Sequence, residues 1–197
     1  MAITQLAPAP RPIGIFPRFI AQSSETLVLK EKIFSLSGDS FDIKSAGSNN
    51  TAFKVKGEAL SLSGRKHLLD ANGDSVFDIR KEHFTLHKTF YGQDESGNHL
   101  FEVRKKLQLI GSKAICTFTS TTGQEEELIM EGDFFDSRAE ISTKEGQVVA
   151  LIDRKYFNAR EFIGGQQTYG VTVAPNVDMA VITAMCICLD ELRNEPA

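Results

Sequence analysis

The most apolar stretch of the chain lies near its C-terminus, at residues 177–192. Between Met179 and Leu189 every residue is apolar except Thr183, so a helix formed here has no polar face. Such a helix is stable only where protein or lipid surrounds it on all sides. Sixteen helical residues reach roughly 24 Å, which is short of a ~30 Å hydrocarbon core. The pattern therefore predicts a helix enclosed by protein.

The start of this helix is also marked in the sequence. Pro175 ends the preceding segment, because proline cannot donate a backbone hydrogen bond. Asn176 is a favourable capping residue, and Asp178 is expected in the first turn, where the helix dipole favours an anion.

Short alternating segments fill most of the remaining chain, and one phrase recurs in them. An aromatic residue, a charged residue, Ile or Val, and a base follow one another at Phe41-Asp-Ile-Lys44, Phe53-Lys-Val-Lys56, Phe77-Asp-Ile-Arg80 and Phe101-Glu-Val-Arg104. A period of two places the apolar residues on one face of a strand and the charges on the other. Turn sequences containing glycine precede each copy, as at Asn72-Gly-Asp74 and Ser96-Gly-Asn98. These features predict hairpins that share one apolar inner face.

Further strands are predicted at 26–36, 60–62, 67–69 and 83–91. In the second half, 114–119 pairs with 125–130 across Thr122-Gly123, 138–143 pairs with 148–152 across Glu145-Gly146, and 166–173 forms the last strand. The fold class is therefore mainly β, with about a dozen strands wrapped around one helix. A meander of this kind removes its open edges when it closes into a barrel.

The N-terminal region has a different composition. Four prolines, Pro8, Pro10, Pro12 and Pro17, lie among small residues, which is typical of an extended segment. We therefore divide the chain into a proline-rich lead-in at 1–24, largely uncoupled from the rest, a single domain at 25–193 and a tail at 194–197.

An ordered series of short motifs spanning residues 27–192 resembles the LURP-one-related family. The motifs are Phe41-Asp-Ile-Lys44, Phe53-x-Val-x-Gly57, Leu69-Asp-x-x-Gly73, Gly132-Asp-Phe-Phe-Asp136, Ile141, Gly146, Val149-Ala150, Ile152, Arg154-Lys155, Tyr169-x-Val-x-Val173-Ala-Pro-x-x-Asp178-x-Ala180 and Leu189-Asp190-Glu191. This family is similar to the tubby C-terminal domain and the phospholipid scramblases. The resemblance implies a closed antiparallel β-barrel of about twelve strands, threaded by the hydrophobic C-terminal helix. The tubby relatives imply phosphoinositide binding.

Charge and cysteine content narrow the function classes. The net charge of −4 argues against a general nucleic-acid binder, which needs a basic face. Cys116, Cys186 and Cys188 have no zinc-like spacing and are expected as buried, reduced thiols. The alternative is a palmitoylated or redox-active pair.

Paired bases are the most suggestive candidate for a binding site. They occur at Arg65-Lys66, Arg80-Lys81, Arg104-Lys105-Lys106 and Arg154-Lys155, and most of them close a predicted strand. If the strand ends share one rim, the bases form a cluster that binds phosphates. The alternative is the solvated outer face that alternation requires in any case. We select Arg80, Lys81, Arg104, Lys105, Arg154 and Lys155 as candidate residues for an anionic headgroup.

Catalytic and metal-binding patterns are weak. His83 and His87 lie on one face if 83–91 is a strand, but no third ligand has suitable spacing. Residues 125–127, with Asp133 and Asp136, do not form a loop of alternating oxygen ligands for calcium. No nucleophile elbow is present, and Gly164-Gly165 lacks the lysine of a phosphate-binding loop.

The sequence therefore predicts a non-enzymatic, tubby-like module without a cofactor or a bound metal. We expect it to act in the cytoplasm, in peripheral contact with a membrane, and to bind an anionic phospholipid headgroup or a protein partner, but not nucleic acid. The alternatives are a scramblase-like membrane protein with its C-terminal helix inserted, a carrier that encloses a small ligand, and a family member with a purely structural role.

Overall fold

The structure, a computed structural model, describes residues 5–30, 40–58, 65–83, 85–106, 112–132, 138–153 and 168–194. Within these ranges it contains a short 3-10 helix, twelve strands and one α-helix. Their bounds are η1 (Pro17–Phe19), β1 (Glu25–Lys30), β2 (Ser40–Ser45), β3 (Thr51–Gly57), β4 (Lys66–Asp70), β5 (Ser75–Lys81), β6 (Thr89–Gln93), β7 (His99–Lys106), β8 (Ser112–Thr119), β9 (Glu125–Gly132), β10 (Arg138–Thr143), β11 (Val148–Asp153), β12 (Thr168–Val173) and α1 (Met179–Asn194). The strand predicted at 60–62 lies outside the described residues.

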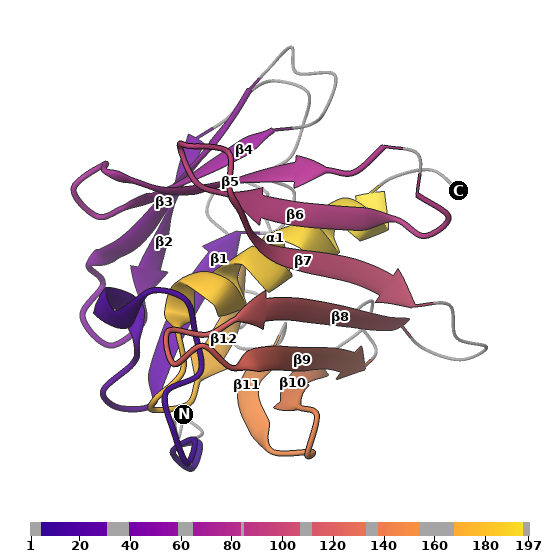
Figure 1. Ribbon diagram of the computed structural model, residues 1–197. Helices are drawn as coiled ribbons and strands as arrows, with labels where there is room; N and C mark the ends of the chain where they lie inside the picture. The colour runs from indigo at the N-terminus through magenta and orange to yellow at the C-terminus, as the bar shows by residue number, and fades with distance from the viewer. Residues whose placement is uncertain are drawn as a thin grey trace.

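The strands form a closed antiparallel barrel in which neighbours in sequence are neighbours in the wall (Figure 1). The barrel closes where β1 pairs with β12, with Leu27 opposite Val171. Because every strand has a partner on both sides, the wall has no open edge. The predicted fold class, a closed barrel of about twelve strands around one helix, is confirmed.

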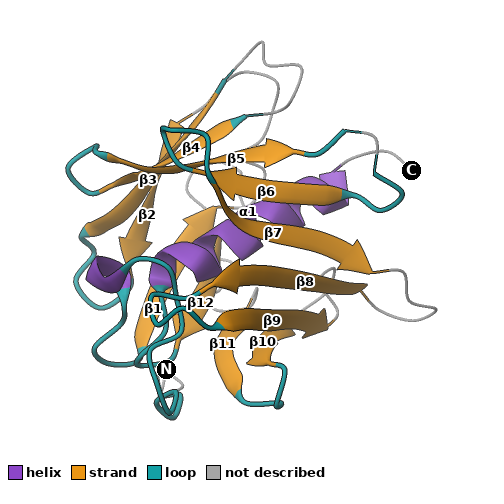
Figure 2. Ribbon diagram, viewed as in Figure 1, coloured by secondary structure: helices purple, strands orange, loops and turns teal. Residues whose placement is uncertain are grey.

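The recurring aromatic–aliphatic phrase forms the inner face of the wall, as alternation predicts. Its described apolar members are all buried: Ile43, Phe53, Val55, Phe77, Ile79, Phe101 and Val103. The helix α1 runs through the barrel and fills the space that these side chains face (Figure 2). Every residue from 180 to 190 is buried, so the helix needs no polar face. The inner face of the barrel and the apolar helix thus form one hydrophobic core.

The helix is capped by Asp178 rather than by Asn176, which corrects the sequence-based expectation. The backbone N–H of Ala180 donates to Asp178 Oδ1 at 2.9 Å, and the N–H of Ile182 donates to the Asp178 carbonyl at 3.2 Å. Asn176 instead has a φ of 68°, and its side chain donates to the Ala9 carbonyl at 2.8 Å. A residue with positive φ at this turn cannot also begin the helix, so the cap lies two residues later.

Among the described residues, no helix is long and apolar enough to cross a membrane.

The two ends of the barrel differ in how the strands are joined. At the end where α1 begins, which we call the N-terminal rim, short turns join β2 to β3, β4 to β5, β6 to β7, β8 to β9 and β10 to β11. At the end where α1 finishes, which we call the C-terminal rim, strands β1, β3, β5, β7, β9 and β11 end. Side-chain hydrogen bonds hold α1 there: Lys66 Nζ donates to Glu191 Oε1 at 2.6 Å, and Tyr169 Oη donates to Asp190 Oδ2 at 2.9 Å.

The proline-rich segment packs across the N-terminal rim, so the expectation of a largely uncoupled lead-in is wrong. The N–H groups of Ala9, Ile13 and Ala21 donate to carbonyls of residues 175–177 at 2.9–3.0 Å, and all three side chains are buried. Backbone hydrogen bonds therefore join this segment to the residues between β12 and α1. Sequence reasoning missed this because an extended proline-rich segment has no hydrophobic period to read.

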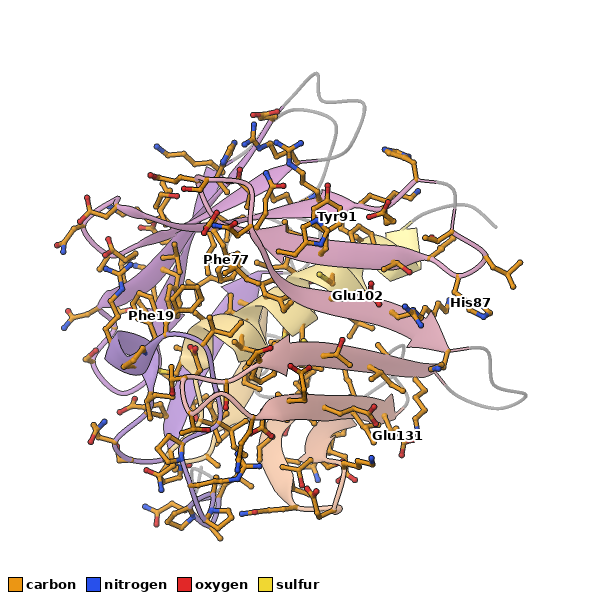
Figure 3. All side chains as sticks on the ribbon, viewed as in Figure 1. Phe19, Phe77, His87, Tyr91, Glu102 and Glu131 are labelled. Carbon is orange, nitrogen blue, oxygen red and sulfur yellow. The ribbon has the colours of Figure 1, made fainter. Side chains whose placement is uncertain are left out.

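Aromatic side chains and one carboxylate fix the same segment. Phe16 stacks on Phe77 at a centroid distance of 5.7 Å, and Phe19 meets Phe53 edge-on at 5.0 Å. Phe19 and Phe77 lie at the left end of the barrel in Figure 3. The N–H of Phe16 also donates to Asp178 Oδ2 at 2.8 Å. The segment thus closes the N-terminal rim with apolar rings.

The strand predicted at 83–91 is shorter than expected, because β6 begins only at Thr89. His83 and residues 85–88 belong to the connection between β5 and β6 at the C-terminal rim. Leu86 lies within the predicted strand, but its side chain is 95% exposed. Leu86 lies beyond the ends of the strands, where the barrel has no interior that could bury its side chain.

Gly92 allows a close approach inside the wall, and this leads to a first prediction. A Cβ added at Gly92 would lie 2.1 Å from Cε1 of the Phe101 ring. We expect Gly92→Ala to lower the free energy of unfolding by about 1–3 kcal/mol, since overpacking forces neighbouring side chains to shift. Urea unfolding measures the effect. Gly47→Ala is the control because its added Cβ has no heavy atom nearer than 3.9 Å. Equal stability of the two variants would contradict the packing described here.

Candidate functional site

Strand direction brings the described candidate bases to one end of the barrel. Strands β5 and β7 both pair antiparallel with β6, so they run in the same direction and both end at the C-terminal rim. Arg80 and Lys81 close β5, and Arg104 and Lys105 lie at the end of β7. Strand β11 ends at the same rim at Asp153, but the candidates Arg154 and Lys155 lie outside the described residues. Four of the six candidates are therefore gathered at the C-terminal rim.

The four described candidates divide into two kinds by the face they occupy. Arg80 directly follows the buried Ile79 and Arg104 directly follows the buried Val103, so both have the register of the outer surface of the wall. The Arg104 guanidinium donates to Glu102 Oε1 at 2.6 Å. When the Gln93 amide is oriented with its oxygen toward Arg80, that oxygen accepts from Nε at 3.0 Å and from Nη2 at 3.2 Å. Both arginines are thus held against the outer wall by neighbouring side chains.

The two lysines have the register of the inner face but lie past the last buried residue of their strands. Lys81 follows the buried Ile79 by two positions, and Lys105 follows the buried Val103 by two. Residues on this face point toward the barrel axis, so at the rim they meet the opening rather than the outer wall. Lys81 and Lys105 are therefore the candidates best placed to face a ligand at the end of the barrel.

Two further bases beside Lys105 were absent from the predicted site. Lys88 ends the β5–β6 connection, and its carbonyl accepts from the N–H of Lys105 at 3.0 Å. Lys106 is exposed at the end of β7. The contact between Lys88 and Lys105 depends on strand pairing, which no local sequence signal reveals. His87, the residue before Lys88, lies at the right-hand end of the molecule in Figure 3, beyond the start of β6.

Both residues of the first basic pair, Arg65-Lys66, contact acidic side chains within the protein. Arg65 Nε donates to Asp78 Oδ2 at 2.8 Å, and its Nη2 contacts the same oxygen. His67 Nδ1 lies 2.6 Å from Asp78 Oδ1 and its Nε2 lies 3.1 Å from Glu58 Oε1. Lys66 is buried against Glu191, as described above. These charges balance one another on the outer wall and at the helix end, so they add little to a site for an external anion.

The acidic residues concentrate at the opposite end of the barrel. The turns of the N-terminal rim and the strand ends beside them carry Asp70, Asp74, Asp94, Glu95, Glu125, Glu126 and Glu145. Two of these pair with bases of the N-terminal segment: Arg11 contacts Glu126 through both carboxylate oxygens, and Arg18 Nη1 lies 3.5 Å from Asp70 Oδ2. At the C-terminal rim, Glu131 near the end of β9 forms an ion pair with Lys113. In the described part of the chain, acidic side chains thus predominate around the N-terminal rim, whereas the C-terminal rim carries its bases together with acids such as Glu58, Glu82 and Asp153.

Metal and thiol chemistry find little support among the described residues. No group of three or more His, Cys, Asp or Glu side chains in those ranges is arranged to hold a metal ion. The thiols of Cys116, Cys186 and Cys188 are all buried and not joined in disulfides, as expected for structural cysteines. Burial raises the pKa of Cys116 and of Cys188 well above the ordinary thiol value. Both thiols therefore stay protonated near neutral pH and are poor nucleophiles.

Comparison with known proteins agrees with the architecture. The family model described as LURP-one-related matches residues 25–190. Protein LURP-one-related 15 of Arabidopsis thaliana is 25% identical over 198 residues, covering 96% of this chain and 90% of that protein. Protein LURP-one-related 10 of the same plant is 25% identical over 189 residues, covering 92% of this chain and 96% of that protein.

The fold also matches a solved structure. An X-ray structure of an Arabidopsis thaliana protein superposes with a TM-score of 0.65 at 21% sequence identity, covering 93% of this chain and 99% of that one. At this identity the match speaks for the fold alone. The family model, by contrast, spans most of the chain and agrees with the motif series found in the sequence. The chain belongs to the LURP-one-related family.

Proposed function

We propose that this protein is a non-enzymatic module that binds anionic phospholipid headgroups at its C-terminal rim. The observation that carries the proposal is the gathering of Lys81, Lys88, Lys105 and Lys106 at one end of the barrel, opposite the acidic turns. Lysine ammonium groups bind phosphate oxygens as point charges and need no fixed fork geometry. Such a rim attracts a negatively charged membrane surface and orients the barrel axis toward it.

The proposed location is the cytosolic face of a membrane, whose leaflet carries anionic lipids. Contact there is peripheral, because α1 is enclosed by the wall and is buried from Ala180 to Asp190. Insertion of this helix into lipid, as in a scramblase-like protein, would empty the barrel and expose its apolar inner face to water. A ligand enclosed in the barrel would compete with the same helix for space. The rim is therefore favoured over the interior as the place of function.

A vesicle-binding experiment tests the proposal. We expect the protein to sediment with phosphatidylcholine vesicles that contain phosphatidylserine or phosphatidylinositol bisphosphate, and not with phosphatidylcholine alone. The double variant Lys81→Gln/Lys105→Gln should bind anionic vesicles about 30-fold more weakly at low ionic strength, at about 1 kcal/mol for each base near the surface. Adding Arg80→Gln and Arg104→Gln should cost less per residue, because both arginines have the register of the outer wall and not of the face that meets the opening.

The matched control removes two lysines from the other end of the barrel. Lys44 lies near the end of β2 and Lys144 in the turn between β10 and β11, both at the N-terminal rim. Lys44→Gln/Lys144→Gln changes the net charge equally but should reduce binding by less than about threefold. Equal losses in the two double variants would mean that net charge alone governs binding. Equal binding of the native protein to neutral and anionic vesicles would refute the proposed function.

A further inference from the structure

The connection between β5 and β6 is a well-anchored projection of the C-terminal rim. At its base, the N–H of Glu82 donates to the Thr89 carbonyl at 2.9 Å, which extends the pairing of the two strands. The N–H of Lys105 donates to the Lys88 carbonyl at 3.0 Å, which ties the end of the connection to β7. Residues 82–83 and 85–88, which we call the β5–β6 loop, are thus held by three strands.

The tip of the β5–β6 loop is stiffened by hydroxyl groups. The His87 carbonyl accepts from Thr85 Oγ1 at 2.7 Å and from Thr89 Oγ1 at 2.9 Å. These two hydrogen bonds fix the backbone on both sides of Leu86. A tip with a fixed backbone loses little conformational entropy when it contacts another surface.

Leu86 is presented outward from this tip. Its side chain is 95% exposed, and no other large hydrophobic side chain is exposed among the residues that the structure describes. A single exposed leucine needs no explanation in general. This one is set apart by its neighbours, since Lys81 precedes the loop, Lys88 is its last residue, and Lys105 and Lys106 end the adjacent strand. The one acidic residue of the loop, Glu82, is half-buried at its base.

We propose that the β5–β6 loop docks onto an anionic bilayer by inserting Leu86 into the boundary between headgroups and acyl chains. The four lysines stay at the level of the phosphates, which matches an apolar tip surrounded by positive charge to an apolar layer covered by negative charge. This inference rests on the proposed function and names the surface as a lipid bilayer. A free phosphate or a soluble headgroup offers the lysines the same charge but offers Leu86 no apolar phase.

The absence of tryptophan from the chain makes the insertion directly measurable. In Leu86→Trp, the new indole is the only tryptophan and its fluorescence reports its own surroundings. We expect its emission to shift to shorter wavelength on vesicles containing phosphatidylserine, and to be quenched by brominated acyl chains. Ser96→Trp is the matched control, because Ser96 is exposed in the β6–β7 turn at the opposite end of β6. Its emission should not change.

A second variant separates insertion from charge attraction. Leu86→Ser should bind anionic vesicles about tenfold or more weakly, the loss expected when one leucine side chain no longer leaves water. The same variant should bind soluble inositol phosphate as the native protein does, because every lysine is retained. Its unfolding in urea should also be unchanged, since the side chain is exposed.

The outcomes distinguish the inference from the function on which it rests. If the native protein binds anionic vesicles but Leu86→Ser binds equally well and the emission of Leu86→Trp stays that of an indole in water, insertion is refuted while headgroup binding stands. If the native protein binds no anionic vesicle, both ideas fail together. Burial of the indole of Leu86→Trp by a protein partner, with no response to vesicles, would show that the loop serves a protein interface and would also overturn insertion.

Discussion

Replacing Ile187 by aspartate is expected to leave the protein without a folded state in solution. Ile187 is 1% exposed and lies in the part of α1 that the barrel encloses. An unpaired carboxylate in this apolar interior costs several kcal/mol, whether it is held charged or is forced to take up a proton. The total stability of a domain of this size is only about 5–15 kcal/mol. Ala184→Asp places the same charge on the enclosed helix and should have the same effect.

The measurement is the fraction of each variant recovered in solution, followed by circular dichroism and urea unfolding of any soluble protein. Leu86→Asp is the matched control, because it also exchanges an aliphatic residue for aspartate but at a 95% exposed position. We expect that control to unfold within about 0.5 kcal/mol of the native protein. A soluble Ile187→Asp protein with one cooperative transition would show that α1 is not enclosed.

The second large effect is expected at Asp178, where the helix and the N-terminal segment meet. Asp178 Oδ2 accepts from the N–H groups of Ile15 at 3.0 Å and Phe16 at 2.8 Å, and Oδ1 accepts from that of Ala180 at 2.9 Å. Asp178→Ala leaves all three donors without this acceptor and removes the helix cap. We expect a loss of about 3–7 kcal/mol, because each of the two unsatisfied donors in the N-terminal segment costs about 1–3 kcal/mol and the lost cap about 1.

Loss of Asp178 should also loosen the N-terminal segment before the barrel unfolds. Limited digestion with trypsin reads this out at Arg18, which lies in the segment and stacks on Phe19 at 4.6 Å. We expect faster cleavage there in Asp178→Ala than in the native protein. Asp74→Ala is the control, since Asp74 is an exposed turn residue of the same rim. Similar stability and similar cleavage in the two variants would contradict the anchoring role of Asp178.

The effect of Asp178 should depend on pH. Burial raises the pKa of this carboxyl above its ordinary value of 3.8, although the N–H donors of Phe16, Ala180 and Ile15 offset part of the rise. The native state therefore holds the proton more tightly than the unfolded chain does. The resulting contribution to stability is fully present below the unfolded pKa and is lost as the pH rises through the native pKa. The difference between the native protein and Asp178→Ala should thus be smaller at pH about 7 than at pH about 4.

Local sequence patterns determined the architecture of this protein. The alternation at Phe53-Lys-Val-Lys56 and Phe77-Asp-Ile-Arg80 was enough to identify inner and outer faces, because side chains on a strand alternate between two environments. The continuous apolar run from Met179 to Leu189 identified a helix that must be enclosed, because no part of its surface tolerates water. The turn glycines marked the ends of the hairpins. Together these signals were sufficient for a barrel around a helix.

Only the tertiary structure decided how the segments at the ends of the barrel are used. The N-terminal segment packs on the barrel because Phe16 and Phe19 find the rings of Phe77 and Phe53, far away in sequence. Leu86 lies in a segment predicted as a strand, yet it is exposed because the wall has already ended. Both outcomes depend on where the barrel stops, and the sequence near each residue does not contain that information.

The roles of the basic residues were also decided in three dimensions. The sequence presents Arg65-Lys66 and Arg80-Lys81 as two basic pairs of the same kind, although only the second closes a predicted strand. In the barrel, Arg65 and Lys66 meet Asp78 and Glu191, and Lys81 closes β5 at the C-terminal rim. Periodicity determined that charges alternate with apolar residues along the strands, because only the inner face of the wall is apolar. Strand register and the position of the helix end decided which surface each base reaches and which groups it meets, since a charge is balanced by its neighbours in space and not by those in sequence.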